Sequence, residues 1–302
     1  MQNIATHLWF DKEAKEASEF YVATFGGDSK VNLVKTLEGT PSGPVDIVDF
    51  QVLDHHFQAI SAGPLFTFNP SISFMVNFDP SQDPEAKTKI DTVWGKLAEG
   101  GKVLMELGSY PFSEYYGWIE DRYGVSWQLI LTESEGEKRP AILPSLLFTG
   151  NVYGKSEVAS DFYLSVFKDS KRGIVARYGA GQEPDTADAV MYTDFMLGSQ
   201  WFVAMDSARG HDFAFNESVS FMVECEDQEV IDYFWSKLSA VPESEQCGWL
   251  KDKYGVSWQV VPTAMYRMMK EGTAEQIARV TQAFLQMKKF DIATLEAAFK
   301  NQ

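Results

Sequence analysis

Few side chains in this sequence are of the types that commonly do chemistry. There are four histidines, at positions 7, 55, 56 and 211, and two cysteines, Cys225 and Cys247. Two thiols cannot form a disulfide framework, and neither has a zinc-type spacing such as C-x2-C. A thiol is an effective nucleophile only beside a base or with a lowered pKa, and the sequence offers Cys247 no such partner. We interpret Cys247 as structural, with a place in a ligand site as the alternative.

A second set of candidates recurs along the chain. Residues 121–128 read DRYGVSWQ and residues 252–259 read DKYGVSWQ, and Gly-Trp pairs ending at Trp118 and Trp249 precede them. Aromatic rings around a few polar groups are typical of small-molecule pockets and equally of protein cores. Neighbouring strand residues face opposite ways. If Gln128 and Gln259 face a binding cup, the tryptophans before them pack under helices.

This recurrence is part of a duplication. NPSISFMV at 69–76 matches NESVSFMV at 216–223, Asp49-Phe50 matches Asp194-Phe195, and Phe20-Tyr21 matches Phe162-Tyr163, all in one order. Ordered self-similarity is the signature of tandem repeats. The polar, Pro-containing segment TESEGEKRPAILP separates the two copies.

Each copy alternates strand and helix signals in the order β-α-β-β-β, twice. In the first copy, ATHLWF and SISFMVNF each begin such a unit, and an amphipathic helical pattern follows each one. After Pro262 the pattern becomes helical. Thr273 and Gln276 form a capping box, and Asp291 can cap a last helix. The sequence therefore predicts an α+β protein of four modules with a C-terminal helical tail.

The segments LGSQWFVAMD, ESEQCGWLKDKYGVSWQVVP and AFLQMKKFDIATLEAAF resemble the PhnB-like branch of the vicinal-oxygen-chelate superfamily, which includes glyoxalases, bleomycin-resistance proteins and dioxygenases. Members are often labelled 3-demethylubiquinone-9 3-methyltransferase. The resemblance implies two tandem glyoxalase-like domains, at residues 1–135 and 141–262, followed by helices at 263–302. In this fold, paired β-α-β-β-β modules curl into a cup around a ligand.

In metal-dependent relatives, His or Glu side chains from the first and last strands of each module meet in the cup. Carried onto this sequence, the resemblance gives neutral or weak donors at most of these positions: His7, Gln58, Ser71 or Ser73, and Gln128 in repeat one, and Ser145, Phe202 or Val203, Ser218 or Ser220, and Gln259 in repeat two. Zinc requires three or four nitrogen, sulfur or carboxylate donors. We therefore expect no metal and no other cofactor.

Charge and length exclude other classes. The 302 residues carry a net charge of −17, which repels phosphate backbones and anionic lipid. The N-terminus lacks the pattern of a signal peptide, and no apolar run is long enough to span a bilayer. We expect a cytoplasmic protein without nucleic-acid or membrane partners, whose repeats pair within the chain as a pseudo-dimer and require no further oligomer.

The favoured function is binding of a small, aromatic or hydrophobic molecule without a metal. A metal-dependent lyase, isomerase or dioxygenase is one alternative. The methyltransferase of the family label is another, disfavoured because no Gly-rich strand–turn–helix motif for a methyl donor is found. Repeat two, the closer match to the family, is the preferred site, and His55-His56 is expected in an exposed turn. The candidate cup residues are His7, Gln58, Trp118, Gln128, His211, Cys247, Trp249 and Gln259.

Overall fold

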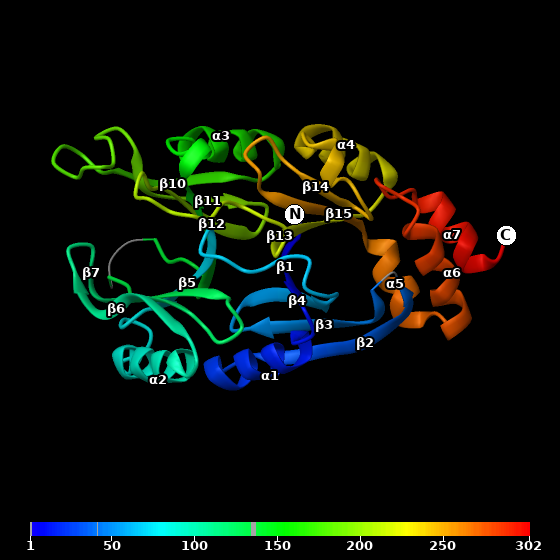
Figure 1. Cartoon of the computed structure of the whole chain (residues 1–302), viewed down its shortest axis with the longest axis horizontal. Coiled ribbons are helices and arrows are strands. Elements are labelled where there is room, and N and C mark those ends of the chain that lie inside the picture. Colours follow the sequence, from blue (N-terminus) through cyan, green and yellow to red (C-terminus); the bar gives the residue numbers. More distant parts are fainter. Residues whose placement is uncertain (1, 41, 134–136) are drawn as a thin grey trace.

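The computed structural model describes residues 2–40, 42–133 and 137–302, and these form two mixed sheets flanked by helices (Figure 1). The predicted α+β class, the tandem modules and the helical tail are confirmed. The modules of repeat one are β1 (Ile4–Phe10), α1 (Ala14–Phe25), β2 (Lys30–Thr40), β3 (Gly43–Val52) and β4 (His55–Ser61), then β5 (Ile72–Phe78), α2 (Ala86–Ala98), β6 (Lys102–Tyr110), β7 (Ser113–Glu120) and β8 (Ser126–Leu131).

Repeat two follows the same order except in its last module, where no described strand corresponds to β6, so this module is β-α-β-β rather than the predicted β-α-β-β-β. Its modules are β9 (Ile142–Phe148), α3 (Ser156–Val166), β10 (Lys171–Arg177), β11 (Val190–Leu197) and β12 (Gln200–Asp206), then β13 (Val219–Cys225), α4 (Gln228–Leu238), β14 (Trp249–Lys251) and β15 (Ser257–Pro262). Short 3-10 turns lie at Gly150–Val152 and Pro242–Ser244.

The two repeats share both sheets. One sheet has the order β14-β15-β13-β1-β4-β3-β2, and the other has the order β10-β11-β12-β9-β5-β8-β7-β6. The joints between repeats are antiparallel, β1 with β13 and β5 with β9. Each sheet thus combines a module from each repeat. In each sheet, one face is turned away from the four helices of the modules, α1–α4. We call this face cup A in the seven-stranded sheet and cup B in the eight-stranded sheet.

The opposite sheet faces pack against the helices. Trp127 and Trp258 are fully buried. The Trp127 ring centroid lies 5.2 Å from that of Tyr21 on α1, and the Trp258 centroid lies 5.4 Å from that of Tyr163 on α3. Because side chains alternate along a strand, Gln128 and Gln259 face the cups. The expected division between tryptophan and glutamine is therefore correct.

The repeated DxYGVSWQ motif has a structural cause in a buried aspartate. Asp252 accepts hydrogen bonds from the backbone of Tyr254 (2.8 Å) and Val256 (3.1 Å), from Trp258 Nε1 (2.9 Å) and from the Tyr163 hydroxyl (2.7 Å). Asp121 binds its own turn and Trp127 in the same way in repeat one. The motif therefore joins the last turn of each repeat to its tryptophan core.

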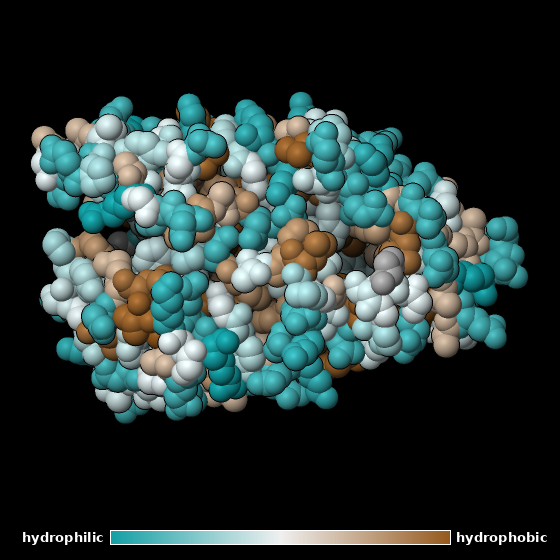
Figure 2. Space-filling model, viewed as in Figure 1, coloured by the Kyte–Doolittle hydropathy of each residue, from teal (hydrophilic) through white to brown (hydrophobic). Residues whose placement is uncertain are grey.

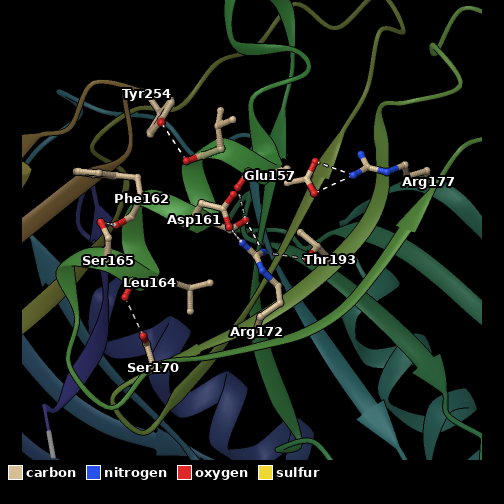
Figure 3. A network of polar contacts seen from close by, with 12 residues as sticks. Glu157, Asp161, Phe162, Leu164, Ser165, Ser170, Arg172, Arg177, Thr193 and Tyr254 are labelled. Atoms are coloured by element: carbon tan, nitrogen blue, oxygen red, sulfur yellow. Dashed lines mark hydrogen bonds and ion pairs between the residues drawn. The ribbon is translucent and has the colours of Figure 1, made fainter.

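Ion pairs hold the edge strand of the cup B sheet against its helix (Figure 3). Arg177 on β10 contacts both Glu157 carboxylate oxygens, at 2.8 and 2.9 Å. Arg172 donates to Ser160 Oγ at 2.7 Å and pairs with Asp161, both on α3. One wall of cup B is thus fixed to α3.

The C-terminal tail contains α5 (Thr263–Glu271), α6 (Ala274–Phe284) and α7 (Ile292–Lys300). The Thr273–Gln276 capping box is present, and Asp291 accepts from Thr294 N at 2.7 Å, as predicted. These helices lie beside the cup A sheet and away from cup B (Figure 1). Within the described part of the chain, no helix has the length and hydropathy needed to cross a membrane.

Candidate functional site

Cup A brings together candidates from both repeats. His7 on β1 lies opposite Gln58 on β4 and Ser220 on β13 in the strand register. Gln259 on β15 donates to Ser220 Oγ at 3.0 Å. The Trp249 ring meets the His7 ring edge-on, with centroids 5.1 Å apart. The sequence had grouped His7, Gln58, Ser71 and Gln128 as one set; that grouping is wrong, because modules pair across repeats.

The C-terminal tail covers cup A. Gln58 Nε2 donates to the Tyr266 hydroxyl of α5 at 3.1 Å. At one edge of the sheet, Gln282 of α6 donates to the Gly39 carbonyl at 3.1 Å. At the other edge, the backbone of Cys247 and Gly248 donates to residues after α6. The tail therefore joins the two edge strands, β2 and β14, across the cup.

The equivalent positions in cup B form a strip of neutral polar groups on the sheet floor. The Tyr116 hydroxyl donates to Gln128 Oε1 at 2.7 Å, and Gln128 Nε2 donates to Ser73 Oγ at 2.7 Å. Ser145 pairs with Ser73 in the register, and its hydroxyl is buried without a protein partner. Val203 occupies the place that Gln58 has in cup A.

Apolar side chains surround this polar strip. Met75, Leu143, Trp201 and Val203 form a buried cluster separate from the main core, and four partly buried residues pack against it: Ile130, Tyr192, Met196 and Met205. No described segment equivalent to α5–α7 lies over this face. A cleft system of about 2160 Å³ includes Met75, Tyr116, Gln128, Tyr192 and Met205 and extends along α2. Figure 2 shows the surface hollowed between the two halves of the molecule at this end.

The buried charge beside cup B is already paired. Arg139 Nε donates to Asp194 at 2.6 Å, and its guanidinium lies 3.8 Å from the Trp201 ring centroid. Asp194 also accepts from Ile174 N at 2.6 Å. The sequence reading missed both Arg139 and Asp194. Asp194 could have been found from the Asp-Phe pair that recurs in both repeats. Arg139 could not, because it lies in the linker, which matches no segment of the other repeat.

Burial controls the titration of groups in both cups. It lowers the pKa of His7 to about 3, so its imidazole is neutral at pH 7. It raises the pKa of the Tyr116 phenol well above its usual value, which keeps that hydroxyl a hydrogen-bond donor. Burial also raises the pKa of the Cys247 thiol. None of these shifts creates a nucleophile or a general base poised near neutral pH.

The remaining candidates lie at the margins of the cups. Trp118 lines the cup B cleft and donates through Nε1 to Ser126. His211 also lines this cleft, with its Nε2 2.9 Å from Ser207 Oγ. Cys247 lies under the tail, with Sγ 3.5 Å from the Phe284 carbonyl.

The expectation for the histidine pair is wrong. His55 and His56 begin β4 rather than occupying an exposed turn, because the turn itself is formed by Leu53 and Asp54. His55 is buried and bonds to Thr6 Oγ1 at 2.8 Å, and His56 pairs with Asp49 at 2.7 Å.

The donor groups do not suit a metal ion in either cup. At the positions where metal-dependent relatives carry their ligands, cup A offers one imidazole with amides and a hydroxyl, and cup B offers hydroxyls, an amide and a valine. Divalent transition metals require several imidazole, thiolate or carboxylate donors. Among the described residues, no group of three or more His, Cys, Asp or Glu side chains could hold a metal.

Two curled sheets built from paired β-α-β-β-β modules define the vicinal-oxygen-chelate fold. Glyoxalase I from Zea mays shares it, with a TM-score of 0.53 and 13% identity over 89% of this chain and 96% of that one. At this identity the likeness concerns the fold alone.

The family is shown by sequence. The model of the 3-demethylubiquinone-9 3-methyltransferase family matches residues 2–130 and 140–261, so the chain belongs to that family. A solved structure described as a PhnB protein of this family from Bacillus cereus is 36% identical, covering 43% of this chain and 100% of its own, with a TM-score of 0.39. No curated protein sequence matches the chain.

Proposed function

We propose that cup B binds a small, uncharged, largely aromatic or hydrophobic molecule without a metal ion. The observation that carries this proposal is the contrast between the cups: the tail covers cup A, while cup B lies in an open cleft. Apolar walls with a few convergent polar groups are the usual composition of a small-molecule site. The earlier preference for repeat two does not carry over, because each cup takes strands from both repeats.

The polar strip indicates where the ligand would be oriented. Both polar atoms of the Gln128 amide have a partner: Oε1 accepts from the Tyr116 hydroxyl, and Nε2 donates to Ser73 Oγ. Ser73 therefore retains its own proton to donate, and the Ser145 hydroxyl has no protein partner. A carbonyl or ether oxygen of a ligand could accept from these two hydroxyls, and the Ser145 hydroxyl is otherwise a costly unpaired group.

Charge complementarity favours a neutral ligand. Arg139 is already paired with Asp194 and stacked on Trp201, so it would not be a free partner for an anion. The methionines of the wall, Met75 and Met205, are flexible and polarisable, and such side chains adapt to aromatic surfaces of different shape. The site therefore suits a neutral planar molecule with one or two hydrogen-bonding atoms.

The test compares 2-naphthol with 2-naphthoate on the purified chain by calorimetry and thermal shift. We expect 2-naphthol to bind at least about ten-fold more tightly, which corresponds to about 1.4 kcal/mol. Gln128→Leu should weaken binding by a similar factor through loss of the polar strip. Gln259→Leu, the matched change in cup A, should leave it unchanged.

The reverse pattern would refute the proposal: loss of binding with Gln259→Leu and none with Gln128→Leu. A stoichiometric transition metal in protein purified without chelator would instead support the metal-dependent enzyme alternative.

A further inference from the structure

The C-terminal tail places a polar side chain inside cup A. The hydroxyl of Tyr266 accepts a hydrogen bond from Gln58 on the sheet floor. Near it, Lys35 on β2 donates to the Met269 carbonyl of α5. A phenol ring is thus presented to the concave face of a ligand-binding fold by a segment outside the repeated modules.

The floor beneath the tail keeps an unsatisfied polar atom. His7 is 6% exposed, and its Nδ1 is buried without a hydrogen-bond partner. The Trp249 ring stands edge-on to the His7 ring, with centroids 5.1 Å apart, and the Trp9 ring stands edge-on to Trp249, with centroids 5.9 Å apart. An aromatic enclosure around an unpaired imidazole nitrogen has the composition of a small-molecule site.

Two differences between the repeats lie where the tail packs: no described strand corresponds to β6, which leaves the β14 edge to the tail, and one side chain of the edge is smaller. Tyr116-Gly117-Trp118 of cup B corresponds to Cys247-Gly248-Trp249 of cup A. In cup B the tyrosine of this triplet donates to Gln128, whereas in cup A the smaller Cys247 has its Sγ 3.5 Å from the Phe284 carbonyl of the tail. At the neighbouring residue, Phe290 of the tail approaches Gly248 so closely that an added Cβ would lie 2.4 Å from its ring.

The short helices of the tail depend on the sheet for their order. They have 9, 11 and 9 residues, and isolated helices shorter than about 12–15 residues are marginal in water. Their order therefore depends on packing against the sheet through a few buried side chains, among them Phe290 and Leu295. A molecule that took the place of Tyr266 would compete directly with that packing.

We propose that cup A is a second binding site, for hydroxylated aromatic molecules, and that the C-terminal helices keep it closed by placing Tyr266 where the ring of such a molecule would lie. This inference is independent of ligand binding in cup B.

The test uses p-cresol, the tyrosine side chain as a free molecule, on full-length Tyr266→Ala. Calorimetry should detect one more bound p-cresol per chain than in the wild type, at least ten-fold tighter than any binding the wild type shows at cup A, and p-cresol should raise the variant's Tm. Adding Gln58→Leu should abolish most of this gain. Tyr233→Ala is the matched control, because Tyr233 is a half-buried tyrosine on α4 that donates to the Val166 carbonyl outside both cups.

The proposal is overturned if folded Tyr266→Ala binds no additional p-cresol, if Tyr233→Ala gains the same site, or if Gln58→Leu has no effect. A second measurement does not depend on the variant folding. In the wild type, p-cresol should accelerate amide exchange in α5–α7 and not in α3 or α4. Unchanged exchange in the tail up to the solubility limit of p-cresol would also overturn it.

Discussion

At the residue scale, the two buried aspartates of the repeated motif show how a few atoms fix a turn. Asp252 is 1% exposed and accepts four hydrogen bonds. Burial raises the pKa of the matching carboxyl, Asp121, to about 6. The two motifs are therefore nearly identical because their aspartates hold the turn and the buried tryptophan in place. A binding site in the turn is not needed to explain the match.

Replacing Asp252 with alanine should destabilise the fold by at least about 3 kcal/mol, because it leaves several buried donors without an acceptor. Urea unfolding at pH 7 would measure this loss. Asp212→Ala, at an exposed aspartate of the 207–215 loop, should change stability by less than about 0.5 kcal/mol. Equal effects for the two variants would show that the buried network adds nothing.

The histidines of cup A should make stability depend on pH. Burial holds the folded pKa of His7 near 3, below its ordinary value of 6.5. The stability that the folded state gains by burying a neutral His7 is therefore fully present above pH 6.5. It is lost as the pH falls toward 3. At pH 5 the loss should be about 2 kcal/mol. His7→Phe should remove that part of the acid sensitivity, measured as unfolding free energies at pH 7 and pH 5.

His56 provides the opposite control. Burial lowers its pKa, but the hydrogen bond and charge of Asp49, together with Glu224, outweigh burial and raise it overall. Its contribution is present below its unfolded pKa and is lost as the pH rises through the folded pKa. His56→Gln should therefore cost more stability at pH 5 than at pH 7. The same pH trend for His7→Phe would contradict the assignment of His7 as a buried neutral base.

At the element scale, local patterns predicted the strands, the helices and the capped tail, since each depends on side-chain periodicity and caps within a short segment. The patterns did not reveal what the tail covers. An apolar stripe such as that of α6 shows that a helix is buried on one face and says nothing of its partner. The histidine pair was misplaced because a turn at Leu53-Asp54 has no Gly or Pro to mark it.

The fit between tail and sheet can be tested at Gly248. Gly248→Ala would place a Cβ 2.4 Å from the Phe290 ring and should displace the tail. Gly179→Ala is the matched control: both glycines have a left-handed φ, +84° and +74°, but nothing lies within 4 Å of a Cβ at position 179. Both variants pay the backbone cost of about 1 kcal/mol or more. Only Gly248→Ala should also speed proteolysis within 274–300; equal rates would mean that Phe290 does not anchor the tail.

At the scale of the whole molecule, the sharing of both sheets between repeats could not be read from the sequence. Duplicated modules carry nearly the same alternating pattern on their first strands. β1 therefore offers a suitable edge to either β5 or β13, and period-two alternation sets which face is buried rather than which strand is the neighbour. The positions of the cup residues along each strand were predictable; their grouping into two cups required the topology.

Because both joints between repeats lie inside one chain, the edges at the middle of each sheet are already paired. We expect the protein to be monomeric at micromolar concentration, with a light-scattering mass near 34.0 kDa. A stable dimer or tetramer at that concentration would show that a further interface exists beyond the internal pairing.

The shared sheets also predict how the molecule responds to a cut between repeats. A protease site inserted after Glu133 would divide the chain into two halves, joined by β1 with β13, by β5 with β9 and by the tail on β2. Neither half has a complete sheet alone. The cut protein should therefore keep its mass near 34.0 kDa in buffer.

Its urea midpoint should be lower than that of the uncut protein. This lower midpoint should increase with protein concentration, because unfolding of the cut protein includes dissociation of the halves. The uncut protein is the control, with a midpoint independent of concentration. If the halves separate on cutting, or if the midpoint of the cut protein ignores concentration, the repeats fold as independent domains and the shared sheets do not hold the molecule together.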